Sequence, residues 1–257
     1  MLDGLFQAAL NASALRAETI SVSQLESKSS ALPQPSDIYS VLAPSQNIKL
    51  IAEIKRRSPS RGHLAEISDA PAQGLTYQAA GAHAISVLTE ESGFGGSLSD
   101  LEQVSAKVSI PTLRKDFISN EYQILEARAA GATFVLLILS WLSEEQFGRL
   151  HAFAHSLGLG VLTETHAEEE IDIANSAGAK LIGINTRDLQ TFKTDLGLFE
   201  KMATRLDPVA IKVAESSVKS VQDVRRYRDA GADVVLVGEA LVTGNPAQLI
   251  PEIISVS

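Results

Sequence analysis

Two opposite charges interrupt an apolar stretch in the first quarter of the chain. In IAEIK, at 51–55, Glu53 and Lys55 are two positions apart. Residues at that spacing face the same side of a β-strand, and burying a charge is costly unless it is paired or used in a reaction. The spacing therefore predicts either a structural ion pair or an acid and a base that act together on one ligand.

The elements that would position these groups are eight apolar runs that alternate with amphipathic segments. The runs are continuous rather than alternating, which is typical of parallel strands covered by helices. The segments between them repeat apolar residues every three or four positions, as helices do. The predicted strands lie in residues 48–55, 84–89, 110–116, 134–140, 159–165, 181–185, 209–216 and 234–239.

Ala-Gly-Ala recurs about every 50 residues, each time between a helix-like segment and an apolar run. Glycine at that point supplies the left-handed backbone that ends a helix. Eight even units without a dinucleotide fingerprint predict an α/β fold, the (β/α)8 TIM barrel, over the alternative of a doubly wound open sheet. We expect one domain over residues 1–257, with an N-terminal helical extension (1–46) as a lid over one end of the barrel (47–257).

Polar and charged residues are unusually frequent at the predicted strand ends. The active site of such a barrel lies at the carboxyl ends of its strands, so these side chains are expected to converge for chemistry. Taken alone, Lys115 or Glu164 is equally consistent with a solvated loop charge. The residues at these ends are Glu53, Lys55, Lys115, Glu164, Asn185, Arg187, Glu215, Ser216, Gly238 and Glu239.

The loops after the last two predicted strands favour an anionic ligand. They read AESS (214–217) and VGEA (237–240), and the corresponding loops of such barrels often bind phosphate through backbone N–H groups. Ser216 offers a hydroxyl, and Gly238 lets a ligand approach the backbone. Together with Lys55, these loops predict a small phosphorylated substrate.

Two phenylalanines follow the second and third predicted strands. Phe94 lies in GFGG (93–96), and Phe117 follows the LRKD segment. They would form either an apolar wall for an aromatic substrate or part of the core.

Composition excludes several classes of protein. A formal net charge of −9 argues against partners such as nucleic acid or an anionic membrane. The N-terminal segment resembles neither a signal peptide nor a transmembrane helix, so we expect a cytoplasmic protein.

No metal site is predicted either. Without cysteine, a metal would need His, Asp and Glu ligands. HAFAH (151–155) lacks the glutamate of a zinc-protease helix and is predicted to be part of an ordinary amphipathic helix. His166 follows Glu164 closely, but no second ligand accompanies it.

The stretch IAEIKRRSPSRG (51–62) closely resembles the signature of the indole-3-glycerol phosphate synthase family, an acid–x–Lys strand end followed by Ser-Pro. The likeness continues in the family's order over nearly the whole chain, including the N-terminal extension. Further matching segments are SVLTE…FGGS (86–97), LRKDF (113–117), TETH (163–166), GINTRDL (183–189), AES (214–216) and LVGEALV (236–242).

The resemblance implies a carboxy-lyase of tryptophan biosynthesis that needs no cofactor and no metal. Its substrate would be 1-(o-carboxyphenylamino)-1-deoxyribulose 5-phosphate. An aromatic carbon attacks the ketone, carbon dioxide leaves, and dehydration gives indole-3-glycerol phosphate.

The resemblance also implies roles for individual residues. Lys115 would be the general acid that protonates the ketone. Glu53 and Lys55 would serve the later dehydration, with Glu164 as a further acid–base or electrostatic partner and Asn185 completing the catalytic set. Substrate binding would fall to Arg187, Glu215, Ser216, Ser217, Gly238, Glu239 and Ser58, with Phe94, Phe117 and Leu136 around the anthranilate ring.

Two departures and two alternative functions accompany this resemblance. Ser217 stands where the family usually has glycine, and a non-glycine residue with positive φ would cost on the order of 1 kcal/mol, so either the turn differs or the phosphate contacts are slightly altered. The loop at 62–70 also differs from the family pattern. One alternative is a catalytically degenerate paralogue that binds a phosphorylated metabolite without turnover. The other, a phosphoribosylanthranilate isomerase, would require a cysteine that this chain lacks. We expect a monomer.

Overall fold

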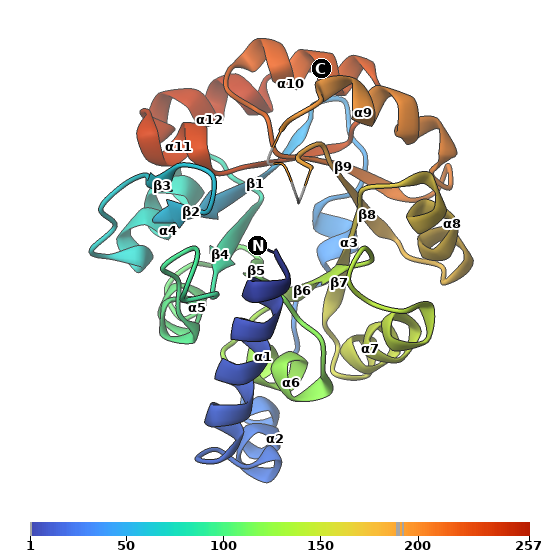
Figure 1. Ribbon diagram of the computed structural model, residues 1–257. Helices are drawn as coiled ribbons and strands as arrows, with labels where there is room; N and C mark the ends of the chain where they lie inside the picture. The colour runs from blue at the N-terminus through green and yellow to red at the C-terminus, as the bar shows by residue number, and fades with distance from the viewer. Residues whose placement is uncertain (1, 189–190, 192) are drawn as a thin grey trace.

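A closed barrel of parallel strands forms the body of the protein (Figure 1). The computed structural model describes residues 2–188, 191 and 193–257, and within them eight strands close in the order β1-β10-β9-β8-β7-β6-β5-β4. The barrel is the predicted one, and the open-sheet alternative is wrong. The strands are β1 (Lys49–Ile54), β4 (Ala84–Leu88), β5 (Thr112–Lys115), β6 (Phe134–Ile138), β7 (Gly160–Thr165), β8 (Leu181–Asn185), β9 (Ile211–Glu215) and β10 (Val234–Val237).

Helices surround the barrel and cover its outer face (Figure 1). The glycines of the four Ala-Gly-Ala matches have φ between 68° and 103°, which confirms the predicted left-handed helix ends. None of the described helices combines the length and apolar composition that crossing a membrane requires. The helices after β1 are α4 (Ala70–Ala79), α5 (Leu98–Ser105), α6 (Glu121–Ala129), α7 (Glu144–Ser156), α8 (Glu168–Ser176), α9 (Leu196–Met202), the 3-10 helix η1 (Ala203–Arg205), α10 (Val221–Asp229), α11 (Glu239–Thr243) and α12 (Pro246–Ile254).

The core has two parts because each strand is buried on both faces. Side chains such as Ile51, Leu113 and Leu162 point into the barrel and fill it. Their neighbours, such as Leu50 and Val161, pack outward against the helices. The strands therefore read as continuous apolar runs, and the rigid body they form fixes the positions of the strand ends.

The N-terminal extension reaches both ends of the barrel. It consists of α1 (Leu2–Ala17), α2 (Val22–Ser30) and α3 (Ile38–Val41). Ile38 of α3 is buried where β7 begins, and a Cβ at Gly160 would lie 2.2 Å from its Cγ2. Leu5 of α1 lines the cavity at the opposite, carboxyl end of the strands. The prediction of a lid over one end therefore describes only part of the extension, since α3 packs at the other end of the barrel.

Candidate active site

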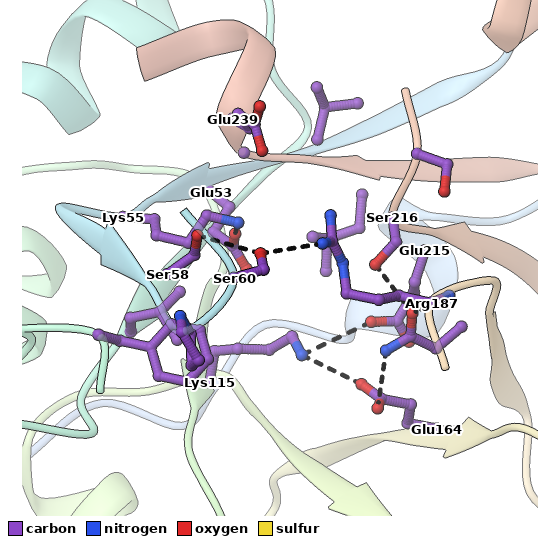
Figure 2. A pocket seen from close by; sticks show the side chains of 18 of the residues that line it. Glu53, Lys55, Ser58, Ser60, Lys115, Glu164, Arg187, Glu215, Ser216 and Glu239 are labelled. Atoms are coloured by element: carbon purple, nitrogen blue, oxygen red, sulfur yellow. Dashed lines mark hydrogen bonds and ion pairs between the residues drawn. The ribbon is translucent and has the colours of Figure 1, made fainter. Parts of the chain in front are cut away.

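A cavity of about 390 Å³ opens at the carboxyl ends of the barrel strands, the position predicted for an active site. Every residue predicted to act in catalysis or substrate binding lines it, and Figure 2 shows the charged side chains converging from different strands. Their functional roles stay predictions. The lining includes Glu53, Lys55, Ser58, Phe94, Lys115, Phe117, Leu136, Glu164, Asn185, Arg187, Glu215, Ser216, Ser217, Gly238 and Glu239.

Lys115, the last residue of β5, reaches between two carboxylates. Its Nζ lies 3.1 Å from Oε2 of Glu164 on β7 and 3.6 Å from Oε2 of Glu215 on β9. The lysine side chain is 15% exposed and each carboxylate 2%. Lys115 and Glu164 are therefore not the solvated loop charges considered as an alternative.

Burial and pairing act in opposite directions on these three groups. Burial lowers the pKa of Lys115, but Glu164 and Glu215 outweigh it and raise that pKa above its ordinary value. Burial raises the pKa of Glu164, but the charge of Lys115 lowers it to about 2. Burial, and then repulsion by Glu164, raises the pKa of Glu215 well above its ordinary range. The cluster thus consists of an ammonium, an ionised Glu164 and a Glu215 that favours its protonated form.

Asn185 joins this cluster to the loop after β9. Its Nδ2 donates to Glu164 Oε1 at 3.0 Å, and its Oδ1 accepts from Ser216 Oγ at 2.8 Å. The backbone N–H of Arg187 also donates to Asn185 Oδ1, at 3.1 Å. Asn185 therefore orients the Glu164 carboxylate and the predicted phosphate loop at the same time.

Glu53 and Lys55 form a second ion pair, with 2.7 Å between Glu53 Oε2 and Lys55 Nζ. The predicted sharing of one strand face is confirmed. A Cβ at Gly238 would lie 2.3 Å from Glu53 Oε2 and 3.1 Å from Lys55 Nζ. Gly238, predicted to admit a ligand to the backbone, thus also leaves the space that this ion pair occupies.

The turn after β9 holds two non-glycine residues in the left-handed region, with φ of 70° at Ser216 and 65° at Ser217. Each such residue costs on the order of 1 kcal/mol. Ser217 Oγ lies 2.9 Å from Thr186 Oγ1, and Tyr227 donates to the carbonyl of Ser216 at 3.3 Å. Ser217 is therefore a non-glycine residue with positive φ, in a turn held by hydroxyl contacts.

One side of the cavity is apolar. Phe94 and Phe117 lie with ring centroids 6.2 Å apart, and Leu136 and Leu5 line the cavity as well. Phe117 is only 9% exposed and also belongs to the barrel core. Phe117 thus both lines the cavity and belongs to the core, and contact with an aromatic substrate stays a prediction.

The loop after β1 forms part of the cavity lining, through residues 58–61. Its strands β2 (Arg57–Ser58) and β3 (Gly62–His63) form a hairpin. Ser60 accepts from Arg187 Nη1 at 3.1 Å, and Arg61 Nη1 lies 2.9 Å from Glu239 Oε1. These contacts link the loops after β1, β8 and β10.

Sequence reasoning missed several residues of the site. Ser60 and Arg61 were inside the signature stretch but were not assigned a role, and Leu5 gave no signal because its place depends on how α1 docks. Gly183, in the middle of β8, was signalled only by a glycine inside a strand. A Cβ there would lie 2.0 Å from Glu215 Oε1, so Gly183 makes room for that carboxyl group.

The histidines lie outside the cavity lining. His166 directly follows β7, and its Nε2 is 3.3 Å from Glu164 Oε1. The rings of His151 and His155 on α7 lie 4.4 Å apart and are tilted by 57°, and Tyr39 hydrogen-bonds to His155 Nε2. The HAFAH segment is thus part of a helix and packs, as predicted.

Comparison with known proteins gives one consistent family. The sequence model described as "Indole-3-glycerol phosphate synthase" matches residues 5–252. The chain is 49% identical over 252 residues to the indole-3-glycerol phosphate synthase of Leifsonia xyli subsp. xyli, covering 98% of this chain and 97% of the relative. It is 48% identical over 229 residues to the enzyme of that name from Streptomyces griseus subsp. griseus, covering 89% and 85%.

A likeness to a solved structure concerns the fold alone. The thiamine phosphate pyrophosphorylase from Pyrococcus furiosus superposes with a TM-score of 0.62 at 14% identity, over 82% of this chain and 96% of that one. At that identity the likeness supports the barrel and carries no argument about activity.

Proposed function

Because the chain belongs to the indole-3-glycerol phosphate synthase family, we propose that it converts 1-(o-carboxyphenylamino)-1-deoxyribulose 5-phosphate into indole-3-glycerol phosphate, carbon dioxide and water. The observation that carries the proposal is the Lys115 ammonium held between Glu164 and Glu215 inside the cavity. A buried cation of this kind can protonate a ketone that an aromatic carbon attacks.

The two unlike sides of the cavity give the substrate one orientation. The anthranilate ring would lie against Phe94, Phe117 and Leu136. The phosphate would lie at the loops after β9 and β10, near Ser216, Ser217, Gly238 and Glu239. Glu239 is paired with Arg61, which offsets its repulsion of the phosphate. In this pose the ketone, midway along the substrate, faces Lys115.

The first step forms the new ring. The aromatic carbon that bears the carboxylate attacks the ketone carbon, and the carbonyl oxygen takes a proton from Lys115 and becomes a hydroxyl group. The bond to the carboxylate then breaks, its electron pair restores the aromatic ring, and carbon dioxide leaves. The ionised Glu164 stabilises Lys115 as an ammonium before the transfer.

The second step is a dehydration. The new hydroxyl leaves as water when it accepts a proton, for which Lys55 is the acid. The neighbouring methylene carbon, next to the aryl amine nitrogen, loses a proton to Glu53, and the indole double bond forms. Because the two groups are only 2.7 Å apart, the proton lost at one site can return to the other within the pair.

The degenerate paralogue is disfavoured by the completeness of the site. Such a protein needs a phosphate loop but has no use for two buried ion pairs whose desolvation is costly. The isomerase alternative is disfavoured because the chain has no cysteine.

The test is an assay of the purified protein with the proposed substrate, followed by indole absorbance and fluorescence. Turnover supports the synthase, and Lys115→Ala is expected to abolish most of it. Tight binding without an indole product would contradict the proposal and favour the degenerate paralogue.

We further infer a cytoplasmic monomer. The lack of cysteine is compatible with a reducing compartment, and a net charge of −9 argues against binding to an anionic membrane. Light scattering on the purified protein checks the monomer, and a dimer mass would contradict it.

A further inference from the structure

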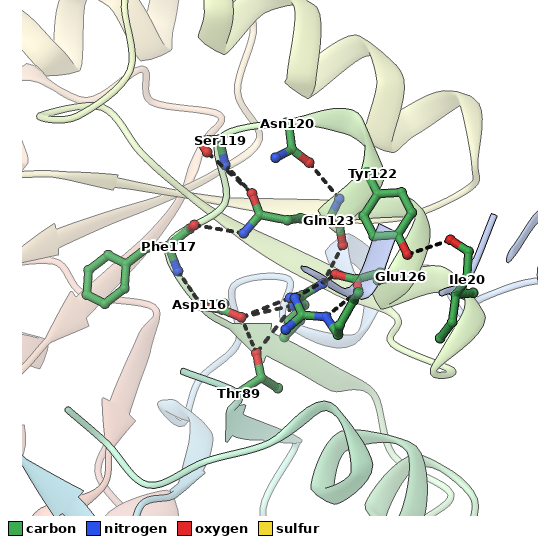
Figure 3. Close-up of polar contacts among 11 residues, drawn as sticks. Ile20, Thr89, Asp116, Phe117, Ser119, Asn120, Tyr122, Gln123 and Glu126 are labelled. Atoms are coloured by element: carbon green, nitrogen blue, oxygen red, sulfur yellow. Dashed lines mark hydrogen bonds and ion pairs between the residues drawn. The ribbon is translucent and has the colours of Figure 1, made fainter. Parts of the chain in front are cut away.

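A network of buried charges lies directly behind the strand end that carries Lys115 (Figure 3). Arg114 is fully buried, with Nη2 donating to Asp116 Oδ2 at 2.9 Å and Nη1 to Glu126 Oε2 at 3.2 Å. Asp116 Oδ1 in turn accepts from the backbone N–H of Phe117 at 2.8 Å. The network therefore fixes the backbone at Phe117, whose ring lines the cavity.

The same network extends to the N-terminal extension through Glu126. Arg16 of α1 donates from both Nε and Nη2 to the two Glu126 oxygens, with 3.0 Å between Nη2 and Oε2. The carboxylate thus lies between two guanidinium groups, one from α1 and one from Arg114 of β5. Bidentate pairing of this kind constrains direction as well as distance.

Helix α1 touches the barrel through one narrow face. Among its described side chains, Phe6, Ala9 and Ser13 are buried, and Arg16 continues the same spacing of three and four residues. Leu15, off this face, is 64% exposed. Because a single short helix is not stable by itself, these few contacts decide where α1 lies.

The beginning of α1 reaches the apolar side of the cavity. Leu5 lines the cavity, and the ring of Phe6 lies 4.5 Å from the ring of Phe117. On its other side Phe6 stacks on Trp141, with 3.9 Å between centroids and 15° between planes. A displacement of α1 would therefore move Leu5 and Phe6 relative to Phe117.

We propose that Arg16 is a positioning residue for the aromatic end of the substrate. Through Glu126 it holds α1 so that Leu5 lines the apolar side of the cavity and Phe6 packs against Phe117. The inference rests on the proposed function, because that function assigns the aromatic ring to this side. Loss of Arg16 weakens binding of the aromatic ring and leaves phosphate binding unchanged.

Arg16 is the member of the network that can be removed with least damage. Its side chain is 25% exposed, whereas those of Glu126, Arg114 and Asp116 are exposed by 5% or less. Without Arg16, Glu126 keeps its contact with Arg114. Removing Arg114 would instead leave buried carboxylates uncompensated and endanger folding.

The experiment compares the full-length wild type with Arg16→Met, Arg16→Lys and a matched control, Lys28→Met. Lys28 of α2 also joins the extension to the barrel, through Glu102 at 2.6 Å, but both side chains are about half exposed. One probe is the substrate with its ketone reduced to an alcohol, which cannot cyclise. The other is inorganic phosphate, which tests the phosphate loop alone.

Calorimetry on the four proteins gives the dissociation constants of both probes, and Trp141, the single tryptophan of the chain, reports the position of Phe6. For Arg16→Met we expect the reduced substrate to bind about fivefold to thirtyfold more weakly, in the lower part of the usual range of coupling between linked sites. Phosphate affinity stays within about twofold of wild type, because distant sites are independent. The fluorescence emission of Trp141 is expected to change, because Phe6 stacks on its ring.

The remaining variants distinguish a positioning role of Arg16 from a general weakening of the contacts between the extension and the barrel. Arg16→Lys recovers part of the affinity, since lysine keeps the charge but loses the paired hydrogen bonds. Lys28→Met binds both probes as the wild type does.

Unchanged affinity of Arg16→Met for the reduced substrate overturns the inference, and so does an equal loss of affinity for phosphate. A wild type that binds the reduced substrate but never forms indole refutes the proposed function. The affinities of Arg16→Met and the wild type for the reduced substrate still decide whether Arg16 positions α1. A wild type that binds neither probe refutes both.

Discussion

At the residue scale, the electrostatics of the Lys115 cluster match the chemistry proposed for it. One cation between two carboxyl groups cannot stabilise both as anions in a buried site. Glu215, whose pKa is raised by burial and by Glu164, is therefore the carboxyl group that favours its protonated form. Glu164 is the carboxylate that stays charged. The two glutamates therefore occupy similar positions but carry different charges.

Replacing each glutamate by glutamine tests this difference. Glu164→Gln removes the charge that stabilises the ammonium, so we expect kcat/KM to fall by about a hundredfold or more. Glu215→Gln imitates a protonated carboxyl group and is expected to cost less than about tenfold. Steady-state kinetics at neutral pH decides, and equal losses in the two variants would contradict the assignment of the proton.

At the element scale, the strand ends position the site, and this much could be predicted from the sequence. The spacing of Glu53 and Lys55 predicted their shared face, and the barrel rule predicted that Lys115 and Glu164 would meet. The two carboxylate partners of Lys115 could not be predicted. Glu215 is predicted to bind substrate, and its contact with Lys115 arises because β5 and β9 face each other across the barrel.

The junction of β10 and α11 offers a second test. A Cβ at Gly238 would overlap the Glu53 carboxylate, so Gly238→Ala is expected to displace the Glu53–Lys55 pair and lower kcat by roughly tenfold to a hundredfold. Gly148→Ala is the control, because nothing lies within 4 Å of a Cβ there. In that exposed helix the change should stabilise the fold by up to about 1 kcal/mol.

Steady-state kinetics of the two alanine variants measures the change in kcat, and thermal unfolding measures the change in stability. Wild-type kcat in Gly238→Ala would show that the ion pair tolerates displacement and has no part in the rate-limiting chemistry.

At the scale of the whole molecule, the extension depends on contacts that no local pattern encodes. A lid over one end was expected, yet α3 closes one end of the barrel and α1 reaches the cavity at the other. Arg114 stood in the LRKDF segment beside Lys115, and only the fold shows that it is fully buried and joined to α1 through Glu126. Such long-range pairings come from tertiary packing, whereas strands and helices follow from periodicity.

The pH dependence of stability is a property of the whole fold. Burial lowers the pKa of His83 and of His151 from 6.5 to about 4, and Nδ1 of His83 accepts a hydrogen bond from the backbone of Leu50. Both are neutral in the fold but take up a proton near pH 6.5 when unfolded. Their contribution to stability is therefore complete above pH 6.5 and is lost as the pH falls towards 4.

Between pH 7 and pH 5 we expect each histidine to lower the free energy of unfolding by roughly 1 to 2 kcal/mol. Glu164 adds little in this window, because its contribution is lost only below its ordinary pKa of 4.5. Urea unfolding at both pH values, for the wild type and for His83→Asn with His151→Gln, measures the effect. The same pH dependence in both proteins would contradict it.

The most direct test of the central claim follows the carboxyl carbon of the substrate. Substrate labelled with ¹³C in that carboxylate is mixed with the wild type and with Lys115→Met, and NMR follows labelled carbon dioxide and indole-3-glycerol phosphate together. We predict that the wild type releases one labelled carbon dioxide for each indole formed, and that Lys115→Met, folded by circular dichroism, forms neither at a measurable rate. Turnover by Lys115→Met within a few-fold of the wild type would contradict the account.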